Sequence, residues 1–439
     1  MATRCLQTDR GWAWLVLFAA VINQIVGVGF SIVLNAYYVP WLQYFGEGRF
    51  MTAWISSVNI GIMFFVGPLA TALTSRFGVQ RSLIASSLLS GSCYVISSYA
   101  QNITTLIVLC GAVSGAGVGV GYMAGYGIIG EYFEKWRGLA YGIAATGVGI
   151  APMILAPLQQ YLIDSYTWRG ALIISAGVVL NGCVVGAIMR DPPVHHTHLP
   201  AHEQRPPCWD SRLIKDAPFL LLCVSNTLCG LGLSPGVVLF YDHLENQGLT
   251  QDAASWAFMI WGILNVCGRL AAAFIIQTQL LQFSGVHVYY VSQTLTGIFS
   301  ALLGIPGQSY LYYNTMAGFY ACCYGMLMAA WPMTCVEMFG QNRLMTAMGW
   351  FQESAGVGYI VGAPLGGYIA DAFGSTALAY YGGGLCLAVG GLVVVPLPYL
   401  RSHGVKVEAA PNHLANDYSK IAPGTVRGML SSDAAMPEV

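Results

Sequence analysis

The sequence predicts an all-α membrane protein with twelve transmembrane helices arranged as two six-helix bundles. Of its 439 residues, 56% are hydrophobic and only 8% are charged, whereas about one quarter of the residues of a soluble protein are charged. Apolar runs recur along the chain, and each is long enough, at about 20 residues, to cross the hydrocarbon core of a bilayer as a helix. A barrel strand would instead alternate in polarity over about ten residues.

The first group of predicted spans follows a short N-terminal segment, 1–11, and belongs to a bundle over 12–190. These spans cover 12–35, 52–73, 82–99, 106–129, 139–162 and 171–189. Each run is continuously apolar, so it satisfies its backbone polar groups within one helix.

The second group of predicted spans belongs to a bundle over 217–400. These spans cover 219–241, 253–276, 286–304, 310–336, 345–370 and 377–397. The segment 191–216 between the bundles contains Pro, His and charged residues, which predicts a solvated cytoplasmic linker. The polar tail 401–439 is expected to be a disordered cytoplasmic segment.

The basic residues predict the orientation of the chain in the membrane. All but three of the 18 Lys and Arg residues fall on one side of the predicted spans. Arg49 and Arg169 fall on the other side, and Arg269 lies inside a span. Because loops rich in Lys and Arg stay in the cytoplasm, both termini and the linker are expected to be cytoplasmic.

The first span carries small and polar residues on one helical face. Asn23, Gly27, Ser31 and Asn35 recur at every fourth position, which places them on the same side of an α-helix. A polar stripe that faces lipid would be costly. The stripe is therefore expected to line either a contact with another helix or a water-filled cavity, and in the second case Ser31 and Asn35 are candidate substrate-binding residues.

Arg269 is the most informative residue, because an arginine in the middle of a span costs at least about 3 kcal/mol. Trp261 and Asn265 precede it by eight and four residues, so the three side chains share one face. A guanidinium binds a carboxylate through two parallel hydrogen bonds and stays charged at physiological pH. An organic acid is the predicted ligand, and a structural ion pair with Glu353 is the alternative.

Two further residues are candidates for the same site. Tyr324 belongs to a stripe with Tyr320 and Met328 in the tenth span, where it either packs in the core or contacts the apolar body of a substrate. Glu353 is an acidic residue well inside a span, and it either pairs with a neighbouring helix or couples transport to protons. No catalytic or metal-ligand cluster is evident, so neither an enzyme nor a cofactor is expected.

Two segments resemble the monocarboxylate transporter family. Residues 9–14 (Asp-Arg-Gly-Trp-Ala-Trp) resemble that family's entry to the first helix. Residues 132–142 (Tyr-Phe-Glu-Lys-Trp-Arg-Gly-Leu-Ala-Tyr-Gly) are similar to its second motif, which leads into the fifth helix. The resemblance extends from about Asp9 to Leu400.

The resemblance implies a major facilitator fold and a plasma-membrane carrier for a small monocarboxylate or related organic acid. It also implies a solute site between the bundles at mid-membrane, exposed alternately to each side. Arg269 matches the arginine with which the family binds the substrate carboxylate, and Tyr324 falls near an aromatic that influences substrate size. The bilayer and the organic acid are the expected partners, together with a single-span immunoglobulin-like accessory glycoprotein in some members; nucleic acid is not.

Two departures from the family concern the coupling ion. The proton-coupled carriers have an aspartate four positions before the arginine, where this chain has Asn265, and a first-helix lysine where it has Ile32. An amide cannot titrate, so the usual proton relay is not expected, and facilitated diffusion, exchange or sodium coupling remain open. The alternatives to an organic-acid carrier are a carrier of a neutral or zwitterionic solute and a non-transporting sensor.

Overall fold

The computed structural model describes residues 9–133, 136–190, 216–278, 284–339 and 344–397. These residues form helices joined by turns, with no strand among them, so the predicted all-α class is confirmed. The predicted linker and tail lie almost entirely outside the described residues. The described residues belong to one compact unit that ends at Leu397.

The N-terminal half, residues 9–190, consists of helices that follow one another with short breaks. They are α1 (Trp12–Gln24), η1 (Ile25–Gly29), α2 (Phe30–Val33), η2 (Leu34–Tyr37), α3 (Tyr38–Phe45), α4 (Arg49–Phe65), α5 (Gly67–Phe77), α6 (Val79–Ser97), α7 (Ile103–Leu106), η3 (Ile107–Val113), α8 (Ser114–Tyr132), α9 (Arg137–Leu180) and α10 (Gly182–Ile188).

The C-terminal half, residues 216–397, contains fewer interruptions. Its helices are α12 (Ala217–Val238), α13 (Phe240–Asn246), α14 (Gln251–Thr278), α15 (Gly285–Leu303), α16 (Tyr310–Phe339), α17 (Leu344–Phe373) and α18 (Ala377–Val394).

A helix lies over each of the twelve predicted spans, but the boundaries differ in three places. The first span is one continuous helical segment over Trp12–Phe45, which contains the π-helical η1 and the 3₁₀-helical η2. The second is bent by 54° between α4 and α5. The fifth and sixth are joined within α9, where Thr167 has a φ of 62° and breaks the helix.

Among the described residues, seven helices are long and apolar enough to cross a membrane, or eight if α4 and α5 form one span. The stretch Leu139–Ile188 counts once in this total although it covers two predicted spans. Helices α6, α15 and α17 are not among these seven helices. In α15 the buried face carries Ser292, Gln293 and Thr296, and the hydroxyls of Ser292 and Thr296 donate to carbonyls of their own helix. Twelve crossings therefore stay a prediction.

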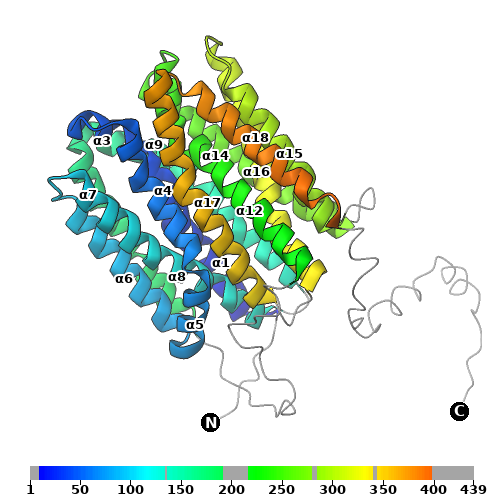
Figure 1. The fold of residues 1–439 in the computed structure, drawn as a ribbon. Coiled ribbons are helices and arrows are strands. Elements are labelled where there is room, and N and C mark those ends of the chain that lie inside the picture. The colour runs from blue at the N-terminus through cyan, green and yellow to red at the C-terminus, as the bar shows by residue number, and fades with distance from the viewer. Residues whose placement is uncertain (1–8, 134–135, 191–215, 279–283, 340–343, 398–439) are drawn as a thin grey trace, which may run out of the picture. The chain divides into compact units, whose positions relative to one another are not determined.

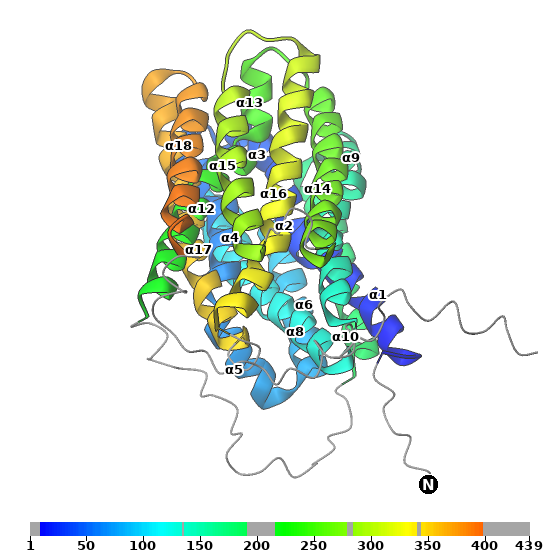
Figure 2. The same ribbon diagram turned by 90° about the vertical axis from the view of Figure 1, so that its right-hand side faces the viewer.

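Two helix pairs make most of the contact between the halves. Helix α4 packs along α17, and α9 packs along α14; Figure 1 shows α4 beside α17, and Figure 2 shows α14 between α9 and α16. Glycines allow the first pair to approach closely, because a Cβ on Gly356 would lie 2.6 Å from the carbonyl oxygen of Gly61. Small residues are the usual means of close helix packing in membranes.

Candidate functional site: a cavity with one guanidinium

A cavity lies between the two halves and is lined by residues from both. The N-terminal half contributes side chains from η1, α2, α4, α8 and α9, and the C-terminal half contributes side chains from α12, α14, α15, α16 and α17. Most lining residues are aliphatic or aromatic. A largely apolar cavity with a few polar groups is typical of a site for a small ligand.

Arg269 is the one charged residue among the described residues that line this cavity. Its side chain is buried, with 4% of the residue exposed. The Nε of Arg269 donates to Oδ1 of Asn265 at 2.9 Å, and Nδ2 of Asn265 donates to the carbonyl oxygen of Ala321 at 3.0 Å. The side-chain amide of Asn265 thus holds the guanidinium through Nε and connects α14 to α16.

The alternative ion pair between Arg269 and Glu353 is not formed, because both ion pairs in the described part of the chain involve Arg49. Glu353 does not line the cavity, although its neighbour Gln352 does. Its Oε2 is buried and makes no hydrogen bond with the described residues. A role for Glu353 in coupling stays a prediction.

The predicted aromatic residues lie at the cavity in two different ways. Tyr324 lines it, and its hydroxyl lies 3.4 Å from the hydroxyl of Tyr359. Trp261 is buried and does not line the cavity, but its ring centroid lies 5.6 Å from that of Tyr324. Trp261 therefore supports the wall of the cavity through Tyr324 instead of forming the wall itself.

The predicted polar stripe of the first span does not reach the cavity. Ser31 and Asn35 are fully buried, and Nδ2 of Asn35 donates to the carbonyl oxygen of Ile32 in its own helix. Val28 and Ile32 line the cavity instead. Val28 and Ile32 also lie four positions apart, so the face of this segment that meets the cavity is a neighbouring one that carries aliphatic side chains.

The N-terminal part of the stripe, Asn23 and Gly27, forms a contact with another helix, which is one of the two expected alternatives. Asn23 Nδ2 donates to the carbonyl oxygen of Gly121 in α8 at 3.0 Å. A Cβ on Gly27 would lie 3.8 Å from Val118 of the same helix. These contacts hold α1 and η1 against α8.

Several lining residues carry no signal that sequence reasoning could use. Gln352 Nε2 donates to the hydroxyl of Tyr122 at 3.1 Å and so connects α17 to α8. Tyr126 and Tyr359 also line the cavity. Each of these residues is an ordinary polar or aromatic side chain in its own helix, and only the packing of the halves brings them together.

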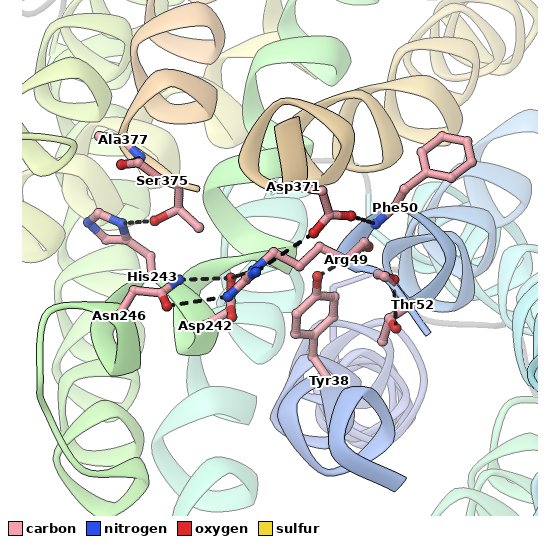
Figure 3. A network of polar contacts seen from close by, with 12 residues as sticks. Tyr38, Arg49, Phe50, Thr52, Asp242, His243, Asn246, Asp371, Ser375 and Ala377 are labelled. Atoms are coloured by element: carbon pink, nitrogen blue, oxygen red, sulfur yellow. Dashed lines mark hydrogen bonds and ion pairs between the residues drawn. The ribbon is translucent and has the colours of Figure 1, made fainter. Parts of the chain in front are cut away.

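At one end of the molecule, Arg49 connects the halves through a polar cluster. Arg49 Nε lies 2.9 Å from Asp242 Oδ2 in α13, and Nη1 lies 3.7 Å from Asp371 Oδ1 in α17. Asp371 also accepts the backbone N–H of Phe50. Figure 3 shows the guanidinium between the two carboxylates, so the cluster connects α4 of one half to α13 and α17 of the other.

The charges of this cluster are partly shielded from water. The Asp242 side chain is 5% exposed and that of Arg49 is 28% exposed. Burial raises the pKa of Asp242 above its usual value although the hydrogen bond from Arg49 opposes the shift. The same hydrogen bond raises the pKa of Arg49. A carboxylate this buried depends on its partner, because an unpaired buried charge is strongly destabilising.

The two segments that carry the family resemblance lie together. The backbone N–H of Trp136 donates to Asp9 Oδ1 at 3.2 Å, and the N–H of Asp9 donates to the carbonyl oxygen of Tyr132. The rings of Trp14 and Phe133 meet edge to face with centroids 5.5 Å apart. Both segments therefore form one junction at the start of α1 and of α9.

Comparison with known proteins agrees with this architecture. Residues 13–352 match the model of the Major Facilitator Superfamily. The chain is 28% identical to "Monocarboxylate transporter 4" of Mus musculus over 83% of this chain and 78% of that protein. It is 28% identical to "Monocarboxylate transporter 13" of Bos taurus, with 91% and 92% covered, and 27% identical to "Monocarboxylate transporter 12" of Xenopus laevis, with 85% of each covered. The resemblance to the monocarboxylate transporters is confirmed, and it indicates a transporter and not an enzyme.

Proposed function

Because the chain belongs to the major facilitator superfamily, we propose that this secondary transporter carries a small monocarboxylate or related organic acid across the plasma membrane by alternating access. Both termini lie on the cytoplasmic side in this proposal. The observation that carries it is Arg269, the single charged residue among the described residues of the cavity lining.

The geometry around Arg269 supports a carboxylate ligand. Asn265 accepts a hydrogen bond from Nε, and neither Nη1 nor Nη2 makes a hydrogen bond or ion pair with the described residues. Two parallel N–H groups match the two oxygens of a carboxylate. An anion in this position offsets the cost of a buried cation, and the names of the related monocarboxylate transporters agree with that class of solute.

The contacts between the halves support alternating access. On the side that holds few basic residues, which is the outer side in this proposal, Arg49 joins α4 to α13 and α17. Opening the cavity to this side would separate these residues and the close pair Gly61 and Gly356. In this proposal the described arrangement is the one closed on the outer side, and rocking of the halves around a central site moves a solute without a continuous pore.

Asn265, which accepts a hydrogen bond from Arg269, is the reason why we propose no proton relay of the usual kind. Asn265 cannot exchange a proton, so the guanidinium keeps its charge when the cavity is empty. We propose facilitated diffusion, exchange or sodium coupling in place of proton symport, with Glu353 as the remaining proton site to test. Uptake of a confirmed substrate that an inward proton gradient drives would contradict this part of the proposal.

The main experiment replaces the guanidinium of Arg269 by an ammonium group, which keeps the positive charge. Arg269→Lys supplies a point charge in place of a planar fork, so uptake of radiolabelled lactate and pyruvate into proteoliposomes should fall by at least about tenfold. Arg76→Lys is the matched control, because Arg76 is exposed and lies outside the cavity lining. It should leave uptake unchanged.

Other results of the same experiment identify the alternatives. Uptake of a neutral or zwitterionic solute that survives Arg269→Lys would mean that this solute is the substrate and that the arginine serves structure. If the wild-type protein takes up neither organic acids nor neutral or zwitterionic solutes, with or without sodium, the result favours a sensor over a carrier. Co-expression with a single-span immunoglobulin-like glycoprotein tests whether an accessory subunit brings the protein to the cell surface.

A further inference from the structure

A run of aromatic rings borders the cavity and crosses from one half to the other. Tyr126 and Tyr122 of α8 meet with centroids 4.9 Å apart, and Tyr122 meets Phe64 of α4 at 6.2 Å. Phe64 meets Tyr359 of α17 at 5.3 Å, and Tyr359 lies beside Tyr324 of α16 through their hydroxyls. All five residues line the cavity, and we call them the aromatic run.

The rings of the aromatic run meet edge to face or with tilted planes. The planes of Tyr122 and Phe64 are 85° apart, those of Tyr122 and Tyr126 are 63° apart, and those of Phe64 and Tyr359 are 40° apart. Tyr126 stacks on Tyr141 outside the run, with planes 14° apart, but none of these contacts within the run is a parallel stack. An additional ring can therefore join by the same edge-to-face or offset geometry that aromatic pairs prefer.

The charge of the cavity restricts the ligand further. Arg269 supplies one positive charge, and no carboxylate is present among the described lining residues. Two lining amides are already occupied, because Asn226 donates to the carbonyl oxygen of Phe351 and Gln352 donates to Tyr122. A second carboxylate on the ligand would have no cationic partner, and burying it would be costly.

We propose that the cavity prefers an aromatic monoanion, with its carboxylate on Arg269 and its ring against the aromatic run. This inference rests on the proposed function, because it assumes that Arg269 binds the carboxylate. It goes further by naming an aryl-substituted monocarboxylic acid, in preference to a short aliphatic acid or a dicarboxylate.

A matched series of acids tests the ring separately from the charge. Uptake of radiolabelled 3-phenyllactate into proteoliposomes is measured against protein-free liposomes, with 3-cyclohexyllactate, lactate, benzylmalonate and 3-phenyllactamide as competitors. Each aromatic contact is worth about two- to tenfold in affinity. Unlabelled 3-phenyllactate should therefore compete at least about twofold better than 3-cyclohexyllactate, which has similar size but no aromatic ring, and better still than lactate.

The outcomes separate this inference from the proposed function. Equal competition by 3-cyclohexyllactate and 3-phenyllactate would overturn the aromatic preference and leave carboxylate transport intact. Competition by 3-phenyllactamide equal to that of 3-phenyllactate would overturn the role of the carboxylate, and with it the proposed function. Benzylmalonate that competes as well as 3-phenyllactate would show that a second charge is accepted, which contradicts the monoanion.

A variant pair places the preference on the aromatic run. Phe64→Leu keeps an apolar side chain and removes the ring that joins Tyr122 to Tyr359, so the preference for 3-phenyllactate over 3-cyclohexyllactate should fall about two- to tenfold. Phe299→Leu is the matched control: Phe299 is also partly buried and stacks on Phe319, but it lies outside the cavity lining. If both variants keep the wild-type preference, the aromatic run does not select the substrate.

Discussion

At the scale of single residues, the pair of Asn265 and Arg269 determines the charge of the cavity. The amide oxygen accepts Nε of the guanidinium at 2.9 Å, and the amide nitrogen is held by the carbonyl oxygen of Ala321. An amide in this position orients the cation and leaves its charge in place. A carboxylate in the same position would neutralise it whenever it was ionised.

Asn265→Asp should make uptake depend on protons. The new carboxylate would pair with Arg269 and compete with the substrate, so uptake at neutral pH should fall. Protonation would release the guanidinium, so acidification of the outer medium should restore uptake. The measurement is uptake of a confirmed monocarboxylate into proteoliposomes between about pH 5 and 8.

Asn226→Asp is the control for this experiment. Asn226 also lines the cavity, but its amide donates to the carbonyl oxygen of Phe351 and makes no hydrogen bond with Arg269. This variant should not acquire the same pH dependence. If Asn265→Asp and wild-type protein respond to pH alike, the contact between residues 265 and 269 does not control the charge available to the substrate.

The sequence predicts the centre of the site better than its walls. Arg269 and Asn265 could be identified because a charge inside an apolar span is rare and because residues four apart on a regular helix meet. Ser31 and Asn35 were candidates for the cavity on the same rule, but Val28 and Ile32 line it instead, because spacing alone does not show which face of a span points to the cavity. Gln352 could not be found, because its partner Tyr122 lies 230 residues away.

At the scale of helices, hydropathy locates the elements well and their breaks poorly. The predicted spans coincide with helices because a membrane requires each long apolar segment to bond its own backbone. The bend between α4 and α5 coincides with Gly67-Pro68, where proline cannot continue the preceding helix. The break at Thr167 carries no such signal.

The close approach of α4 and α17 predicts a large effect from one added methyl group. A Cβ on Gly356 would lie 2.6 Å from the carbonyl oxygen of Gly61 and 2.7 Å from the backbone nitrogen of Phe65. Neither backbone atom can move aside as a flexible side chain would. Gly356→Ala should therefore destabilise the described arrangement by about 1–3 kcal/mol, measured as a lower midpoint of thermal unfolding in detergent.

Gly382→Ala is the matched control for the added methyl group. Gly382 also lies in a helix of the C-terminal half, α18, and a Cβ there would meet nothing within 4 Å. Since alanine is a better helix former than glycine, this variant should unfold at the same temperature or slightly higher. Equal midpoints for wild-type protein and Gly356→Ala would mean that the seam between α4 and α17 is looser than described.

At the scale of the whole molecule, the Arg49 cluster connects the two halves at one end. Three helices from two halves meet at one guanidinium (Figure 3). Removing that guanidinium leaves Asp242 buried without its partner, which costs more than the loss of an exposed ion pair. The state in which Asp242 reaches water should therefore gain population.

Arg49→Gln should shift the carrier towards the state that is open on the outside. Substrate applied from that side should then bind with an apparent affinity about three- to tenfold higher, because more of the protein is competent to bind it. The maximal rate should fall, because returning to the described state becomes harder. Concentration-dependent uptake into right-side-out vesicles measures both quantities.

Arg169→Gln separates this effect from the general loss of an arginine. Arg169 donates to the hydroxyl of Tyr44 and to the carbonyl oxygen of Ala100, which all belong to the N-terminal half. Its replacement should leave the apparent affinity unchanged. A parallel shift in both variants would argue that the Arg49 cluster stabilises the fold without controlling access.

The uncompensated guanidinium of the cavity also makes transport sensitive to voltage. With an anion bound, the charges of ligand and Arg269 cancel, whereas the empty site moves one positive charge through part of the membrane field, worth up to about 2.3 kcal/mol per 100 mV. An inside-negative potential, imposed by a potassium gradient with valinomycin, should therefore slow net uptake and accelerate net efflux. Exchange of one anion for another should not respond, because the carrier never crosses empty.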